Sequence, residues 1–140
     1  MFGLNNQVGG GHYKTGIQPF VFSAANGHDA CTHAIQKYLT RFRRKAGIED
    51  LMKAHHICYI RLDLVRDWGA PDTHEPRIKL AEYLRSNQCC GTTAAAICAV
   101  ERWFRSPQTD HPREADACRA LIRDVAQAHY PDQFKEEDFL

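Results

Sequence analysis

Apolar residues recur at helical spacing along most of the chain. Between residues 29 and 46 they form one stripe, which consists of Cys31, Ile35, Tyr38, Leu39, Phe42 and Ala46. Intervals of three and four residues place side chains on one face of an α-helix. Asp29 can cap the start of this helix, and Gly47 can end it. The pattern therefore predicts an amphipathic helix over residues 29–46.

A second apolar run extends from residue 48 to about residue 68, after a short link that favours an antiparallel helical hairpin. The segment "GAPDTHEP" then interrupts the periodicity with two prolines. Three shorter helices are expected over residues 77–87, 92–105 and 112–129. Thr92 or Thr93 can cap the fourth helix, and Pro112 suits the first turn of the fifth.

Signals for β-strands are faint, so the expected fold class is all-α, with about five helices and an N-terminal helical hairpin as its core. Residues 1–27, which include "GIQPFVF", are expected to form an extended segment that packs on this core. Residues 28–140 are expected to form a single helical domain, with the hairpin at 28–68 and additional helices at 77–130. The tail "DQFKEEDFL" is either frayed or docked.

The composition is that of an ordinary globular domain of 140 residues, with 44% hydrophobic and 25% charged residues. The formal net charge of +1 argues against a general coating of nucleic acid. No run approaches the roughly 20 apolar residues of a membrane span, so no membrane partner is expected. The six cysteines lack CxxC spacing, which favours buried thiols in a reducing cytosol.

The N-terminal stretch "VGGGHYKTG" resembles a phosphate-binding P-loop only superficially. Anchored on Lys14 and Thr15, that motif requires glycine at positions 8 and 13, where this chain has Val8 and Tyr13. Tyrosine is poor where the loop needs a positive φ and a close backbone approach. We therefore interpret the glycines as a flexible lead-in, from which Tyr13 and Lys14 meet a phosphate together with cations of the next helix.

A row of basic residues follows in the first predicted helix. Lys37, Arg41 and Lys45 are four residues apart and share one face, which His33 extends. One interpretation is a solvated basic face on a surface helix. The other is a cationic row that binds phosphates.

Several separated elements of this region resemble, in order, the SaV-like family of small phage proteins, which often carry the name nucleotide kinase. The matching elements are His12-Tyr13, Ile17-Gln18, Lys37-Tyr38 with Arg41, then Lys45, and finally Asp50-Leu51 with Lys53-Ala54. The match covers about residues 12–60. Where the family has Gly-Asn before Lys-Tyr, this chain has His33-Ala34, which puts one family contact to the nucleotide in doubt.

The resemblance implies a (deoxy)nucleoside monophosphate kinase that lacks a P-loop and acts in the cytoplasm of an infected bacterial host. Phosphoryl transfer depends mainly on positioning and on cations near the transferred oxygens. Lys37, Arg41 and Lys45 would then clamp phosphates, and Asp50 would either hold a lysine or help to position a metal. The structural alternative for Asp50 is a helix partner of Lys53. The implied catalytic residues are Lys37, Arg41 and Asp50, and the implied ligand-binding residues are His12, Tyr13, Lys14, Gln18, His33, Tyr38, Lys45 and Lys53. Magnesium would arrive with the nucleoside triphosphate, and no stably bound metal is expected.

Two alternatives remain open at this point. The first is a non-catalytic protein that captures a nucleotide or a nucleotide-derived signal, for example to counter host defence. Binding of RNA or DNA through "RFRRK" is less favoured because of the balanced charge. A homo-oligomer is expected, since one basic row on a small helical protein often needs a second subunit to close a pocket.

For several other residues that could take part in chemistry, the sequence favours a structural role. His28-Asp29 resembles the metal-binding doublet of phosphohydrolases, but its further ligands cannot be assigned from the sequence. His55 is expected at a helix interface as a hydrogen-bonded core histidine. Trp68 and Trp103 are both expected in the core.

Overall fold

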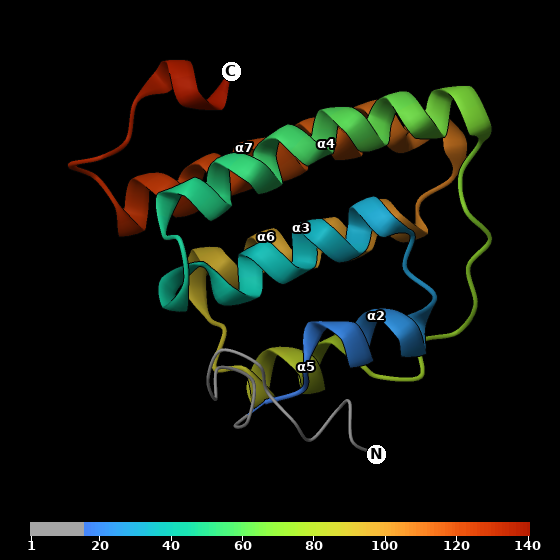
Figure 1. Ribbon diagram of the computed structural model, residues 1–140. Coiled ribbons are helices and arrows are strands. Elements are labelled where there is room, and N and C mark those ends of the chain that lie inside the picture. The colour runs from blue at the N-terminus through green and yellow to red at the C-terminus, as the bar shows by residue number, and fades with distance from the viewer. Residues whose placement is uncertain (1–15) are drawn as a thin grey trace.

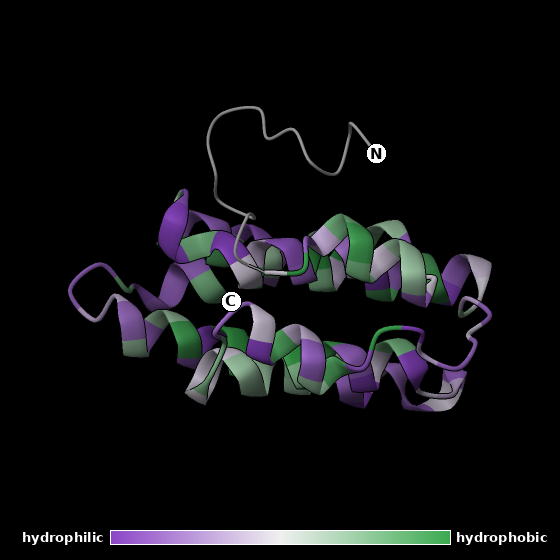
Figure 2. Cartoon of the chain, turned by 90° about the horizontal axis from the view of Figure 1, so that it is seen from below, coloured by the Kyte–Doolittle hydropathy of each residue, from purple (hydrophilic) through white to green (hydrophobic). Residues whose placement is uncertain are grey.

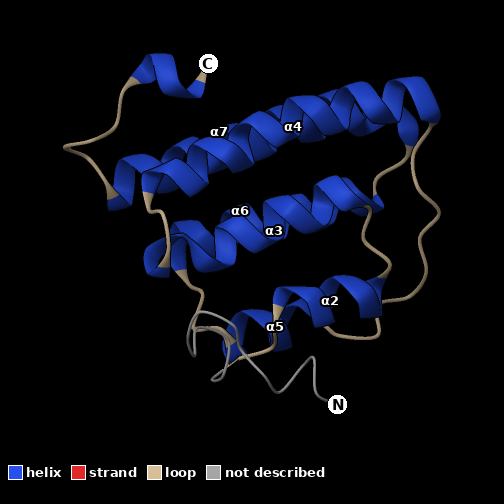
Figure 3. Cartoon of the chain, in the orientation of Figure 1, coloured by secondary structure: helices blue, strands red, loops and turns tan. Residues whose placement is uncertain are grey.

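The computed structural model describes residues 16–140, and all regular structure within that range is helical (Figures 1 and 3). Its six α-helices are α2 (Pro19–Asn26), α3 (Ala30–Arg41), α4 (Ile48–Trp68), α5 (Leu80–Ser86), α6 (Gly91–Arg105) and α7 (His111–His129). Short 3₁₀ turns are η1 (Phe42–Arg44), η2 (Gln108–Asp110) and η3 (Glu136–Phe139). The all-α class is confirmed, with six helices in place of about five.

The helices form three stacked pairs (Figure 1). In that view α4 lies beside α7, α3 lies beside α6 in the middle layer, and α2 and α5 lie below them. The predicted antiparallel hairpin is the pair α3 and α4, and α6 and α7 form a second hairpin packed against the first. Each helix carries hydrophobic and hydrophilic residues (Figure 2). The core between the two hairpins includes Ile35, Leu39, Leu51, Trp103 and Ile122, all at 0% exposure.

Helix α2 corrects the prediction that residues 1–27 are extended. Pro19 occupies the first turn of this helix, and Gly27 ends it in the left-handed conformation with φ of 72°. Proline just inside a helix start and glycine just past its end are favoured, because proline fixes φ and glycine tolerates a positive φ. In the sequence alone, the same proline is equally compatible with extended chain, which is why the helix was not predicted.

Several helix boundaries also differ from the predictions. Asp29 caps α3 as expected, with its side chain accepting the Thr32 backbone N–H. The helix ends at Arg41, and Gly47, with φ of 61°, precedes α4 as its N-cap residue. Helix α6 begins at Gly91 after Cys90, so neither predicted threonine caps it. Helix α5 is shorter than expected, because Arg77 and Ile78 belong to the preceding connection.

The connection from α4 to α5, residues 69–79, runs down one side of the bundle and is held by the buried side chain of Asn26 (Figure 1). The Asn26 amide donates to the Ile78 carbonyl over 2.8 Å. Its Oδ1 accepts the backbone N–H groups of Arg77 and Ile78 over 2.9 and 3.0 Å. One side chain at the end of α2 therefore fixes a segment more than fifty residues away.

The C-terminal tail is docked. Phe139 in η3 is 2% exposed and joins the hydrophobic core, where its ring stacks on Phe134 and meets His55 edge to face. Of the two alternatives left open for the tail, the structure supports docking.

Candidate functional site

Three cationic side chains surround the ring of Tyr38. The Lys37 Nζ lies 4.8 Å from the ring centroid, the Arg41 Cζ 4.9 Å and the Lys53 Nζ 5.9 Å. At such distances an aromatic face attracts a cation through its quadrupole. We call Lys37, Tyr38, Arg41 and Lys53 the Tyr38 basic cluster.

Two helices build this cluster. Lys37 and Arg41 lie one turn apart on α3, and Lys53 lies near the start of α4. Because α3 and α4 are antiparallel, the end of the first helix meets the beginning of the second (Figure 1). Tyr38 is partly buried against the core, so its ring is a fixed platform for the three flexible cations.

Asp50 lies beside the cluster and is fully buried. Its Oδ2 is 3.4 Å from Arg41 Nε and accepts the Ala46 backbone N–H over 3.4 Å. Its Oδ1 accepts from Arg41 Nη2 over 3.5 Å. These contacts orient the guanidinium and close the turn before α4, so the carboxylate holds an arginine and is turned away from solvent.

The cluster is electrostatically unbalanced. Three cations and one carboxylate, that of Asp50, leave an excess of two positive charges around one ring. Like charges held this close repel one another, and the repulsion is stronger near a protein surface than in bulk water. A bound anion with several oxygens would offset this repulsion and accept hydrogen bonds from all three side chains.

The remaining predicted site residues are distributed differently. His33 is directed towards α2, where its Nδ1 lies 2.8 Å from Ser23 Oγ and its ring stacks on Phe20. Lys45 is exposed in the link between η1 and α4. Gln18 occupies the N-cap position of α2. His12, Tyr13 and Lys14 lie outside the described residues.

A second group of basic residues, not predicted as part of the site, adjoins the same helix. Arg43 and Arg44 line a polar cavity of about 280 Å³ together with Thr40, Asn87 and Gln88. The Thr40 hydroxyl is bonded to the Gln36 carbonyl and lies 2.6 Å from the Tyr83 hydroxyl. The consecutive arginines in "RFRRK" indicate one side of this cavity in the sequence. The amide side chains on its other side, Asn87 and Gln88, come from more than forty residues further along the chain.

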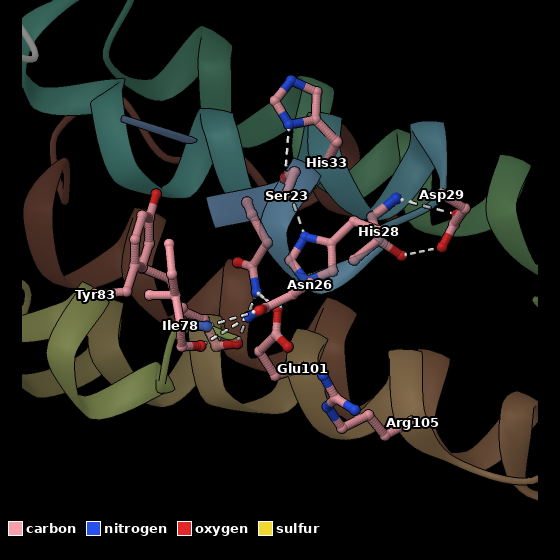
Figure 4. Close-up of polar contacts among 12 residues, drawn as sticks. Ser23, Asn26, His28, Asp29, His33, Ile78, Tyr83, Glu101 and Arg105 are labelled. Carbon is pink, nitrogen blue, oxygen red and sulfur yellow. Dashed lines mark hydrogen bonds and ion pairs between the residues drawn. The ribbon is translucent and has the colours of Figure 1, made fainter. Parts of the chain in front are cut away.

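A buried chain of polar side chains joins α2, α3 and α6 (Figure 4). Ser23 Oγ lies 3.0 Å from His28 Nδ1, and His28 Nε2 lies 2.6 Å from Glu101 Oε1. Gln36 Nε2 donates to the same Glu101 oxygen over 3.2 Å. This order resembles a hydrolytic triad, but the serine is 6% exposed and the His28 side chain 0%. The chain is therefore structural, since no substrate reaches the hydroxyl.

The Ser23 hydroxyl limits the hydrogen-bond directions in this chain of side chains. The single Ser23 hydroxyl proton can serve only one of the two imidazoles that flank it, so the other imidazole must donate. The three groups are therefore linked in one of two directions, from His33 through Ser23 to His28 or from His28 through Ser23 to His33. Burial, aided by the charge of Lys37, lowers the pKa of His33, in keeping with a neutral ring.

The His28-Asp29 doublet is separated by its partners. His28 belongs to the buried chain above, whereas the Asp29 carboxylate accepts from Arg61 Nε and Nη2. Although burial opposes ionisation, Arg61 and Thr32 lower the pKa of Asp29 overall. Across residues 16–140, no three histidine, cysteine or acidic side chains are grouped as metal ligands.

The two tryptophans have opposite environments. Trp103 is fully buried, as expected, and Trp68 is 84% exposed, so the prediction that both belong to the core is wrong for Trp68. His55 is buried between the rings of Tyr59 and Phe139, which confirms its placement in the core.

All six cysteines are free, and burial raises the pKa of the Cys58 thiol to about 12. The expectation of buried thiols holds for Cys58 and Cys118, whereas Cys90 is exposed. Neither buried thiol is poised as a nucleophile.

Comparisons with known proteins identify no relative: no family model, no curated protein and no solved structure matches the chain. Within residues 16–140, no helix has the length and apolar character needed to cross a membrane.

Proposed function

We propose that this protein binds a nucleotide by its phosphates at the Tyr38 basic cluster. The observation that carries the proposal is the position of three cations around one aromatic ring, with Asp50 buried beside them. Phosphate groups offer several negatively charged oxygens, and Arg41 and two lysines offer donors that can reach them from two helices.

The nucleotide class is supported by how the motif residues assemble. The elements that resemble the SaV-like family are spread from residue 12 to residue 54 in the sequence. Five of their side chains, those of Lys37, Tyr38, Arg41, Asp50 and Lys53, converge on the cluster. A merely solvated basic face would not require a buried carboxylate to orient one of its arginines.

A second candidate is phosphoryl transfer between a nucleoside triphosphate and a deoxynucleoside monophosphate. The same convergence favours it, because cations at the transferred oxygens are the main requirement of this reaction. In that reaction Lys37, Arg41 and Lys53 would stabilise the transferred phosphoryl group, and Asp50 would position Arg41. Magnesium would enter with the triphosphate.

The experiment that tests the proposal measures binding first and turnover second. Isothermal titration of the full chain with inorganic triphosphate and with each deoxynucleoside monophosphate and triphosphate reports binding. Lys37→Ala and Lys53→Ala should each weaken triphosphate binding by about tenfold or more, because a charge-assisted hydrogen bond contributes about 1.5–3 kcal/mol. Lys79→Ala removes an exposed lysine elsewhere and should leave binding unchanged.

Turnover is then assayed with each monophosphate and a triphosphate donor, with and without magnesium, by chromatographic separation of products. Product that is lost in Lys37→Ala would establish the kinase activity. Binding without product would assign the protein to nucleotide capture. Unchanged binding in both cluster variants would refute the proposal.

A further inference from the structure

Helix α4 carries an exposed apolar ridge. Ile60, Leu64 and Trp68 are 40%, 44% and 84% exposed, and their spacing of four residues aligns them along one side of the helix. Large apolar side chains that are exposed singly are ordinary, but a contiguous line of them is a mark of an interaction surface. Tryptophan is also the residue type most enriched at the energetic centres of interfaces.

A hollow adjoins the ridge. Leu64 and Trp68 help to line a cavity of about 280 Å³ whose other walls include Ala30, Cys31 and Pro71. The ridge and the cavity together give this face both protruding and recessed apolar surface. Apolar side chains of another molecule can pack against such a surface.

Two charged residues on this side of α4 are placed symmetrically about Ile60. Lys53 precedes Ile60 by seven residues, and Asp67 follows Ile60 by seven residues. Seven residues are close to two full turns, so both charged side chains lie near the same side of the helix as Ile60. A rotation by 180° about an axis through Ile60 would exchange the two positions, and would bring the lysine of one helix to the aspartate of the other.

We infer that two copies of this chain pair through α4, antiparallel about a two-fold axis at Ile60. The pattern suits a second copy because a two-fold interface needs a self-complementary surface, which Lys53, Ile60 and Asp67 supply. In this register Ile60 meets Ile60 of the second copy, and Leu64 packs beside it. Asp67 is bonded to Arg66 within the chain, but both side chains are more than half exposed, and such pairs exchange partners at little cost.

The interface goes beyond the proposed nucleotide binding and does not depend on it. It concerns the outer side of α4, whereas Lys37, Tyr38 and Arg41 belong to α3. The two share Lys53, whose ammonium lies 5.9 Å from the Tyr38 ring centroid, so the variant that separates them is at Leu64, which lies outside the cluster. Oligomeric state and nucleotide affinity are therefore separate readouts, and either proposal can fail alone.

The test is sedimentation equilibrium of the full chain. The wild-type protein should sediment as a dimer, and Leu64→Glu, which places a charge in the ridge, should sediment as a monomer. Phe20→Glu is the matched control, because Phe20 is 64% exposed on α2, in the layer away from α4 (Figure 1), and the variant should leave the dimer intact. Circular dichroism establishes that each variant is folded.

Charge exchange tests the register. Lys53→Asp and Asp67→Lys should each weaken the dimer several-fold, and the double variant should restore it. In a Cys90→Ser background, Ile60→Cys should form an intermolecular disulfide on mild oxidation, because residues on a two-fold axis face themselves. A monomeric wild-type protein would overturn the inference, as would single charge variants that the double variant fails to rescue.

Discussion

Trp103 donates its indole N–H to Nδ1 of His111 over 2.9 Å, and both side chains are buried. His111 Nε2 lies 3.1 Å from the Ser106 carbonyl, so the imidazole carries its proton on Nε2 and is neutral. Burial lowers the pKa of His111, in agreement with this state. The pair closes the turn between α6 and α7.

His111→Phe should therefore destabilise the protein. The substitution keeps a ring in place but leaves the buried Trp103 N–H without an acceptor, at a cost of about 1–3 kcal/mol in the free energy of unfolding. Urea denaturation followed by circular dichroism measures the loss. His56→Phe, at an exposed position of α4, should stay within about 0.5 kcal/mol of the wild type. Equal stability of the two variants would contradict the role of the hydrogen bond.

The stability of the fold should fall on acidification because of His55. Burial, and then the charges of Arg119 and Arg123, lower its pKa from 6.5 to about 4. As the pH falls from about 6.5 to 4, the unfolded state binds a proton that the folded state does not. This difference should remove up to about 3 kcal/mol from the free energy of unfolding.

His55→Gln should reduce this pH dependence, whereas His56→Gln should not. Urea denaturation of the three proteins at several pH values between 7 and 4 gives the slopes. The comparison of slopes matters because burial lowers the pKa of His33, His111 and His129 as well. A His55→Gln slope equal to that of the wild type would show that His55 titrates normally in the folded state.

The repulsion among cations in the Tyr38 basic cluster should appear as a salt effect. Raising ionic strength from about 0.01 M to 0.15 M shortens the Debye length from about 30 Å to 8 Å. The wild-type melting temperature should rise over this range by more than that of Lys53→Gln, which has one cation fewer. Differential scanning calorimetry makes the comparison, with Lys79→Gln as control. A variant that responds to salt like the wild type would argue against strain in the cluster.

Asn26 should control protease access to the connection between α4 and α5. Asn26→Ala removes three hydrogen bonds to Arg77 and Ile78, and so should release the segment from α2. Trypsin cuts after Arg77 and Lys79, and cleavage there should become faster in this variant under native conditions. Mass spectrometry of timed digests identifies the cut. Gln127→Ala, at an exposed position of α7, should be cut at the wild-type rate.

Features set by local sequence were predictable, and those set by packing between distant helices were not. The hairpin, the Asp29 cap and the shared face of Lys37 and Arg41 follow from spacing along one helix. The approach of Lys53 to Tyr38 depends on how α3 and α4 align, and only the family resemblance pointed to it. The His28–Glu101 contact joins residues 73 positions apart and leaves no signal in the local pattern.

Two errors have specific physical origins. Pro19 and Gly27 delimit a helix of eight residues, little more than two turns, so its apolar spacing repeats too few times to stand out in the sequence. Trp68 lies in the last turn of α4, beyond the layer that the other helices cover, although its spacing continues an apolar series. Periodicity shows which residues share a face but does not show whether another element covers that face.

Buried Gln36 determines how α3 can align with α6. Its Nε2 donates to the Ile97 carbonyl over 3.0 Å and to Glu101 over 3.2 Å. Purely apolar helices can slide past one another by a turn, about 5.4 Å, at moderate cost, because one aliphatic contact replaces another. Such a slide here would strand an amide and a carboxylate in the core, each without its partner. The middle layer therefore has one favoured alignment of α3 against α6. As a result, the cationic side chains that α3 presents to α4 keep a fixed position along the axis of the bundle.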